Sequence, residues 1–331
     1  MSPTSASSTA RLAAGRPTPQ APEIDFETAR VSVILASIDA RETIRQSVAA
    51  FLEEVGDRGE VIVVDASRDG SADEVERLFP EVKVLRRDPG QLAPVLWRDG
   101  LLEANSPLVA FSTAQMVPSP GWLDGHLRCM ADTGAAGVGG PIEASYPLPP
   151  VDRAIYLLRY VNYGYPMARS DKAEPPGDNA FYRREALLGV AETWSNGFWE
   201  VEVHRGLRSQ GSRLELTDDA TVEFRGGSRL SGLIRQRGLH ARYYGASRAG
   251  QMGPAQRLLR ILTAPAVPLV LLRRIASALN VRKRSLVPWL PALPSLGILL
   301  TAWTSGEVMG TMFGAPTSTP ACRDAVGFLE G

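Results

Sequence analysis

Short apolar runs alternate with helical stripes along the first third of this chain. Runs typical of β-strands occur at 31–36, 61–64, 82–85 and 108–111. The second run has four consecutive β-formers, which predicts a strand covered on both faces. Between the first two runs, apolar residues recur with the spacing of one helix face at positions 44, 48, 51, 52 and 55. Strands that alternate with helices in this way predict an α/β fold with a mostly parallel sheet and right-handed crossovers.

Polar residues follow the predicted strands where each one ends. Ser37 and Asp39 follow the first run, Asp65 follows the second, and Thr113 and Gln115 follow the fourth. Ligands of open α/β sheets bind in the crevice outside the carboxyl ends of the strands, so Asp65 is a candidate for a ligand site. A nucleotide or another phosphate compound is the expected ligand of such a sheet.

Composition limits the classes of partner. The 331 residues are 44% hydrophobic and 22% charged, which predicts a globular chain with one large core or two domains. The formal net charge is zero, so there is no overall positive field, and we expect no nucleic-acid partner. Cys129 and Cys322 lack the spacing of a metal or redox site, which favours a reducing compartment. Residues 1–30 have no apolar stretch of the kind found in a signal peptide, and we interpret them as a disordered tail.

A second apolar region begins after residue 260. Residues 261–272 are apolar, basic residues are frequent in 273–284, and residues 286–303 carry no charge over 18 positions. That length is near the minimum for crossing a bilayer, although three prolines interrupt its first half. We interpret 251–314 as a helical, membrane-associated segment whose basic part faces the anionic cytoplasmic leaflet, with a tail at 315–331. The alternative is a proline-kinked helical pair that packs on the preceding domain.

Taken in order, the motifs of the chain resemble those of the family-2 inverting glycosyltransferases of the GT-A fold. The segments that carry the resemblance are Val31–Asp39, Glu60–Gly70, Leu96–Gly100, Val109–Leu123, Gly177–Leu187 and Gly197–Gly211. Residues 302–310 also resemble the tails of membrane-associated relatives. The resemblance covers nearly all of 31–314. It implies a GT-A-like glycosyltransferase domain at 31–250, with a Rossmann-type sheet flanked by helices.

The resemblance also implies roles for individual residues. The nucleotide-sugar donor would contact Ala36, Ser37, Asp39, Asp65, Arg98, Thr113 and Gln115. The sugar or the acceptor would lie beside Asp178, Asn179 and Trp199. Counting back from Gly211 sets Glu200 on the second acid of the last motif, which is the general base in the family and removes the proton of the acceptor hydroxyl. The alternative for Glu200 is a surface glutamate on an exposed helix.

The chain departs from the family at the metal-binding Asp-x-Asp pair. Thr113 and Gln115 take the two positions, and a hydroxyl and an amide do not offset the charge of a hard divalent cation. Mg²⁺ or Mn²⁺ would therefore be weakly held, and no metal ligand is assigned. Arginine is the candidate replacement, because it is permanently charged and binds phosphate through two hydrogen bonds. Besides Arg98, the candidates are Arg235 and Arg237, for which a solvated helix face is the alternative.

The favoured function is the transfer of a sugar, with inversion, from a nucleotide sugar to a lipid-linked or polysaccharide acceptor. The reaction would take place at the cytoplasmic face of the cytoplasmic membrane. The alternative is a non-catalytic glycosyltransferase-like module that binds a nucleotide or a partner and has lost turnover together with its Asp-x-Asp pair. Glu200 distinguishes the enzyme from the non-catalytic module, since a module that only binds has no chemical need for a general base at this position. A nucleotidyltransferase is less favoured, because no glycine-rich phosphate loop follows the first strand.

Overall fold

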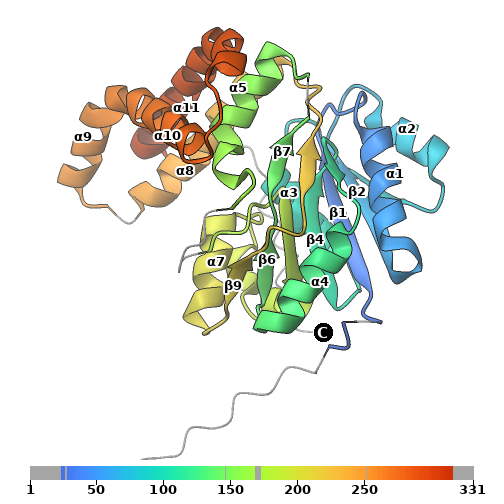
Figure 1. Ribbon diagram of the computed structural model, residues 1–331. Helices are drawn as coiled ribbons and strands as arrows, with labels where there is room; N and C mark the ends of the chain where they lie inside the picture. Colours follow the sequence, from blue (N-terminus) through green and yellow to red (C-terminus); the bar gives the residue numbers. More distant parts are fainter. Residues whose placement is uncertain (1–23, 27, 146, 168–172, 251, 316–331) are drawn as a thin grey trace, which may run out of the picture.

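The computed structural model describes residues 24–26, 28–145, 147–167, 173–250 and 252–315 (Figure 1). A seven-stranded sheet forms its centre, in the order β3-β2-β1-β4-β8-β6-β9. The strands are β1 (Val31–Ser37), β2 (Gly59–Asp65), β3 (Lys83–Arg86), β4 (Leu108–Thr113), β6 (Gly137–Gly139), β8 (Asn179–Arg183) and β9 (Leu214–Leu216). Only β8 runs against its neighbours β4 and β6. The predicted mostly parallel α/β sheet is therefore confirmed.

Helices cover both faces of this sheet, which explains the unbroken apolar run in β2. The helices of this part are α1 (Ile44–Val55), α2 (Ser71–Leu78), α3 (Ala93–Glu103), α4 (Trp122–Thr133), α5 (Pro150–Arg159), α6 (Arg184–Leu188) and α7 (Glu200–Ser209). Val61 and Val63 pack in one core cluster with α1 and α4, whereas Ile62 and Val64 pack in a second cluster with α3 and α7. Successive side chains of a strand point to opposite faces, so a strand covered on both faces is apolar throughout.

A small second sheet extends the first beyond β4. It consists of β5 (Met116–Pro118), β10 (Val222–Phe224) and β7 (Ile142–Ala144), in the order β5-β10-β7. The carboxyl ends of β1, β2 and β4 meet at one edge, because Ser37 pairs with Asp65 and Ala36 pairs with Thr113. Ser112 pairs with Asn179 at the start of the antiparallel β8. The residues that follow these strands are thereby gathered at one edge of the sheet.

A layer of helices formed by the C-terminal part of the chain lies beside this edge (Figure 1). It consists of α8 (Leu230–Ala249), α9 (Pro254–Thr263), α10 (Val267–Val281) and α11 (Leu293–Phe313), with 3₁₀ turns at Ala264–Ala266 and Val287–Ala292. Two of the three prolines noted in 286–303 lie in the second turn, and the third lies at the start of α11. One stretch among the described residues, Val287–Phe313, is long and apolar enough to cross a membrane, which by itself is weak evidence for a span.

The helices α8 and α11 pack closely through glycine. A Cβ atom at Gly306 would lie 2.2 Å from the carbonyl oxygen of Gly238, and one at Gly310 would lie 2.0 Å from the carbonyl oxygen of Arg242. Such distances are possible only between backbones that approach without side chains. The proposed boundary at residue 250 therefore runs between two helices that form one packed unit. The proposed tails at 1–30 and 315–331 lie largely outside the described residues.

We expect Gly306→Ala to lower the free energy of unfolding by roughly 1–3 kcal/mol, because the new methyl group overlaps a backbone carbonyl. Gly297→Ala is the matched control on the same helix. A Cβ atom there has no atom within 4 Å, so this change should raise stability by about 0.5–1 kcal/mol. Urea unfolding of the two variants measures the difference. Equal effects of the two substitutions would contradict the close packing.

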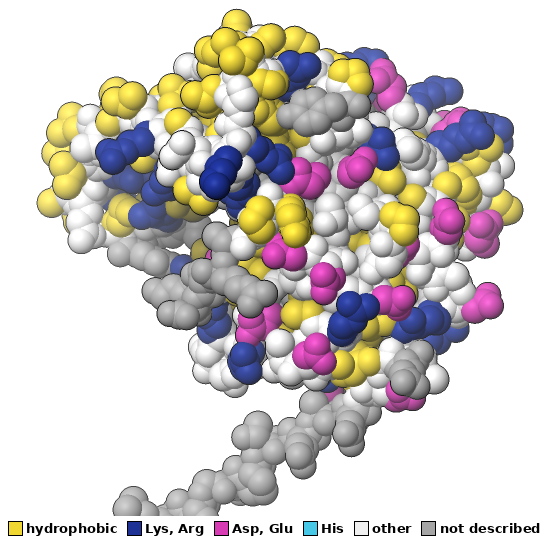
Figure 2. Space-filling view, viewed as in Figure 1, with side chains coloured by type: hydrophobic (Ala, Val, Ile, Leu, Met, Phe, Trp, Pro, Cys, Tyr) yellow, Lys and Arg dark blue, Asp and Glu magenta, His cyan; other side chains and the backbone are white. Residues whose placement is uncertain are grey.

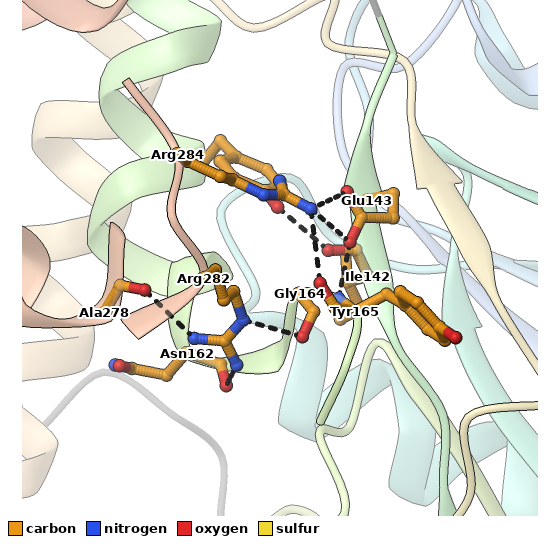
Figure 3. A network of polar contacts seen from close by, with 9 residues as sticks. Ile142, Glu143, Asn162, Gly164, Tyr165, Ala278, Arg282 and Arg284 are labelled. Carbon is orange, nitrogen blue, oxygen red and sulfur yellow. Dashed lines mark hydrogen bonds and ion pairs between the residues drawn. The ribbon is translucent and has the colours of Figure 1, made fainter. Parts of the chain in front are cut away.

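Arginines at the end of α10 fix the helical layer to the sheet domain (Figure 3). The guanidinium of Arg284 donates to both carboxylate oxygens of Glu143, at 2.8 and 2.7 Å. Arg282 donates to the carbonyl oxygens of Gly164, at 2.8 Å, and Asn162, at 2.7 Å. These two members of the basic stretch 273–284 are thus bound within the protein.

Candidate active site

A cavity lies at the carboxyl edge of the sheet, between β1, β4 and the helix α8. Its volume is about 70 Å³, because α8 lies across the edge. Four predicted donor residues line it, namely Ala36, Asp39, Thr113 and Gln115. Charged and polar groups reach it from three helices: Arg159 from α5, Glu200 from α7, and Arg237 and His240 from α8. The fold therefore brings together residues that lie more than a hundred positions apart in the sequence.

The pair Thr113 and Gln115 occupies the end of β4 and the residue just before β5. The hydroxyl of Thr113 is buried and has no hydrogen-bond partner among the described residues. The amide nitrogen of Gln115 donates to the Ser228 hydroxyl at 3.2 Å. Within the described ranges, no three His, Cys, Asp or Glu side chains are close enough to hold a metal ion. A hydroxyl and an amide are neutral, so this donor set does not fit a hard divalent cation.

Arg237 is a buried cation without a partner. Its side chain is 6% exposed, and no hydrogen bond or ion pair joins it to any described residue. Burial lowers the pKa of this guanidinium, and the charge of Arg159 lowers it further. A buried charge without a hydrogen-bond partner is costly, and the carboxylates of Asp178 and Glu200 offset only part of that cost. An anion in the cavity would offset the charge of Arg237 and accept its hydrogen bonds.

Arg159 lies at the last position of α5 and lines the same cavity. Its guanidinium donates to Asp178 Oδ2 at 2.5 Å, and Tyr160 donates its hydroxyl hydrogen to Asp178 Oδ1 at 2.9 Å. Burial acts to lower the pKa of Arg159, but the Asp178 carboxylate outweighs it, and the pKa is raised above its ordinary value. The ion pair holds Arg159 at the cavity wall. Sequence reasoning missed this residue, because α5 also carries Asp152 and Arg153 and nothing in its sequence singles out Arg159.

Glu200 is the first residue of α7, and its half-buried side chain borders two cavities. Burial raises the pKa of its carboxyl group. The negative charge of Asp178 also raises this pKa. A hydrogen bond from the residue's own backbone N–H and the positive charge of Arg159 lower it, but the pKa stays above the ordinary glutamate value. A raised pKa makes a carboxylate a better proton acceptor near neutral pH. Glu202 points elsewhere, where it accepts hydrogen bonds from Arg205 and Ser247.

The neighbouring histidine on α7 has a structural role. His204 is fully buried one turn after Glu200. Its Nδ1 lies 2.6 Å from Glu174 Oε2, and its Nε2 lies 2.7 Å from the Tyr182 hydroxyl. Both ring nitrogens are thus used within the protein, so His204 is not available to a ligand.

A second, larger cavity begins at Glu200 and runs beneath the C-terminal helices. This groove has a volume of about 770 Å³. Asp178 lies at its sheet end, and side chains from α8, α9, α10 and α11 form its walls. Glu200 therefore lies between a polar cavity at the sheet edge and a long groove that reaches the helical layer. A group at this junction can contact ligands in both cavities.

Other predicted donor residues lie at or beside the edge without lining the cavity. The Asp65 carboxylate accepts hydrogen bonds from the Ser67 hydroxyl at 2.7 Å and from the Ser67 N–H at 3.2 Å. The Ser37 hydroxyl lies 3.5 Å from that of Ser67. Arg98 is buried in α3, where its guanidinium donates to Asp99 at 2.6 and 2.8 Å. Arg98 is thus held within the protein, although its partner Asp99 also pairs with Arg87.

The remaining predicted residues have contacts outside the cavity lining. The Asn179 amide donates to the carbonyl oxygens of Pro141 and Ala220 and accepts from the Trp122 indole N–H. Trp199 packs against the rings of His240 and Tyr243. Arg235 is exposed, and its guanidinium lies against Gly90. Of the two arginines predicted on α8, only Arg237 faces the cavity.

Comparisons with known proteins agree with this architecture. Residues 32–189 match the family model Glycosyl transferase family 2. The mannosyltransferase PcManGT from Pyrobaculum calidifontis, solved in complex with GDP-Man and Mn²⁺, is 18% identical, with 90% of this chain and 91% of that chain covered and a TM-score of 0.51. TarS 1–349 of S. aureus is 13% identical over 85% of this chain and 90% of that one, with a TM-score of 0.45. No curated protein matches the chain. The likeness to the mannosyltransferase shows a common fold.

Proposed function

We propose that this chain, whose residues 32–189 match the family model Glycosyl transferase family 2, transfers a sugar from a nucleotide-sugar donor to a lipid-linked or polysaccharide acceptor with inversion. The position of Glu200 between the two cavities is the observation that supports this most strongly. The donor binds at the cavity beside Ala36, Asp39 and Thr113, where α8 has to move aside, because about 70 Å³ is too small for a whole nucleotide sugar. The acceptor approaches Glu200 from the groove.

Glu200 acts as the general base. The acceptor hydroxyl oxygen attacks the anomeric carbon as the bond from that carbon to the diphosphate oxygen breaks, on the opposite face of the sugar. The hydroxyl proton passes to the Glu200 carboxylate, and the bonding electron pair leaves with the nucleoside diphosphate. Attack from the face opposite the leaving group inverts the configuration. The raised pKa of Glu200 suits it to accept this proton.

The leaving diphosphate is stabilised by arginine. Negative charge grows on the diphosphate oxygens as the sugar bond breaks, and fixed donors aimed at that charge lower the barrier. Arg237 supports this role because it is buried at the cavity without a partner, and Arg159 adds a second positive charge on the same wall. The mannosyltransferase structure contains Mn²⁺, whereas Thr113 and Gln115 do not fit a divalent cation here.

A non-catalytic nucleotide- or partner-binding module is the second candidate. The neutral pair Thr113 and Gln115 favours it, since a domain that performs no chemistry can lose its metal site without consequence. The unpaired carboxylate of Glu200 at the junction argues against it. The two candidates share nucleotide binding and differ in turnover.

A panel of nucleotide sugars tests the proposal. We expect one donor to raise the melting temperature, with about 2.7 kcal/mol of stabilisation at a concentration one hundred times its Kd. The same donor should release its nucleoside diphosphate when a lipid-linked or glycan acceptor is added. Stabilisation without release across all acceptors would favour the binding module.

The exposed apolar side chains of the helical layer support contact with a membrane, which we place at the cytoplasmic face of the cytoplasmic membrane. Leu259 and Leu262 of α9 are 63% and 68% exposed, and Leu269 of α10 is 71% exposed. Figure 2 shows hydrophobic side chains over α9, interspersed with arginines, and a larger hydrophobic area over the top of the layer. An apolar surface with basic residues matches an anionic leaflet.

We expect the full chain to sediment with vesicles that contain anionic lipid. Leu262→Glu should reduce the bound fraction, because it adds a charge where the chain would enter the lipid. Val201→Glu is the control, since Val201 is similarly exposed, at 56%, but lies on α7. A full-length chain that stays monomeric and soluble without detergent and does not bind vesicles would remove the membrane proposal.

A further inference from the structure

The groove that begins at Glu200 has one wall from α8 and one from α10. On α8, Arg237, His240, Tyr244 and Arg248 line it, and the spacing of three to four residues puts them on one face. On α10, Val267, Val270, Leu271 and Arg274 line it with the same spacing. Each helix thus contributes several successive turns to its wall of the groove. A ligand that reaches Glu200 through this groove passes along both helices.

The charges in the groove favour an anion. Its lining has five arginines against three carboxylates. Two of the arginines are paired, Arg159 with Asp178 and Arg260 with Glu307. Arg237 was described above, Arg274 has no ion pair or hydrogen bond within the described residues, and Arg248 donates only to the Tyr244 hydroxyl, at 2.8 Å. Arg248 on α8 and Arg274 on α10 are therefore available to a phosphate group from the two walls of the groove.

The groove also has an apolar part on α10. Val267, Val270 and Leu271 form this part of the wall, next to the exposed Leu269 on the outer face of the same helix. A purely hydrophilic glycan gains nothing from such a surface, whereas a hydrocarbon chain is stabilised by leaving water there. The groove thus combines an apolar surface, unpaired arginines and a catalytic carboxylate.

We infer that the acceptor is a lipid phosphate that carries the reacting sugar hydroxyl. Its hydrocarbon chain lies along α10, its phosphate binds Arg248 and Arg274, and its hydroxyl reaches Glu200. This inference rests on the proposed function and narrows its acceptor to one class. It also explains why the catalytic domain is joined to an apolar helical layer through a groove, because the acceptor enters from the membrane surface that the layer contacts.

Binding of a short isoprenoid phosphate tests the inference without any transfer reaction. Geranyl phosphate is titrated into the full chain in neutral detergent and compared with geraniol and inorganic phosphate. We expect each of the two partial ligands to bind at least about tenfold more weakly, since each satisfies only one part of the groove. Arg274→Gln should weaken geranyl phosphate by about tenfold. Arg273→Gln is the matched control, because Arg273 is exposed on the same helix and does not line the groove.

Two outcomes would overturn the inference while leaving sugar transfer intact. One is inorganic phosphate or geraniol binding as tightly as geranyl phosphate. The other is equal effects of Arg273→Gln and Arg274→Gln, which would indicate nonspecific attraction. A chain that binds geranyl phosphate through Arg274 but transfers sugar from no donor would support the ligand of the groove and contradict the proposed function.

Discussion

Replacement of Glu200 by glutamine is expected to reduce the rate of sugar transfer by roughly 10²- to 10⁴-fold. The amide keeps the shape of the side chain at the start of α7 but cannot accept the proton of the acceptor hydroxyl. Because the donor is bound by other residues at the sheet edge, its affinity should change little. Steady-state transfer and nucleotide-sugar calorimetry on the same preparation separate the two effects.

The matched control is Glu202→Gln, two residues along the same helix. Glu202 accepts hydrogen bonds from Arg205 and Ser247 away from both cavities, so its loss should affect transfer only slightly. Equal losses in the two variants would indicate a general folding defect. A Glu200→Gln enzyme with undiminished transfer would reject the assignment of the base and would favour the non-catalytic module.

The pH dependence of transfer gives a second measure of Glu200. The base works only when it is deprotonated, and burial raises its pKa above the ordinary glutamate value. Transfer in the wild-type protein should therefore decline as the pH falls through this raised pKa, at a higher pH than for an exposed carboxylate. The decline should be absent from the residual activity of Glu200→Gln. An acidic limb that persists in this variant would point to another group.

The sheet could be predicted from the sequence because its signal is local. Four apolar residues ending at Asp65 are sufficient to identify a strand that is buried on both faces, and the stripe that includes Ile44, Val48 and Phe51 identifies the helix that covers it. Each pattern lies within one element and reflects the environment of that element. The resemblance to the family, and not a local pattern, pointed to Ala36, Asp39 and Thr113, which line the cavity at the edge where the parallel strands end.

The parts that escaped prediction depend on contacts between distant segments. Arg159 faces the cavity because Asp178, at the start of β8, holds its guanidinium, and no local pattern shows this pairing. Arg235 and Arg237 are equivalent in the sequence, but α8 presents only Arg237 to the cavity. The packing of Gly306 against the backbone of α8 likewise joins two segments that the predicted domain boundary at residue 250 separates. Tertiary contacts therefore decide which charges serve the site.

Arg237→Met is expected to weaken nucleoside diphosphate binding and to stabilise the ligand-free protein. The substitution removes the hydrogen bonds that the guanidinium offers to phosphate, so the affinity should fall by about tenfold or more, or about 1.4 kcal/mol. It also replaces an unpartnered buried cation with an apolar side chain, so the free energy of unfolding should rise by about 1 kcal/mol or more. Calorimetry and urea unfolding measure the two effects.

The opposite signs of these effects distinguish a ligand-binding arginine from a structural one, whose loss would lower stability. Arg235→Met is the control, because Arg235 is exposed on another face of α8 and should change neither quantity appreciably.

The nucleoside diphosphate titrations are repeated with EDTA, which removes divalent cations. Because Thr113 and Gln115 do not fit a divalent cation, wild-type affinity should change by less than about tenfold. A loss of stability in Arg237→Met with unchanged diphosphate binding, or a strong effect of EDTA on the wild type, would reject arginine as the group that replaces the metal ion.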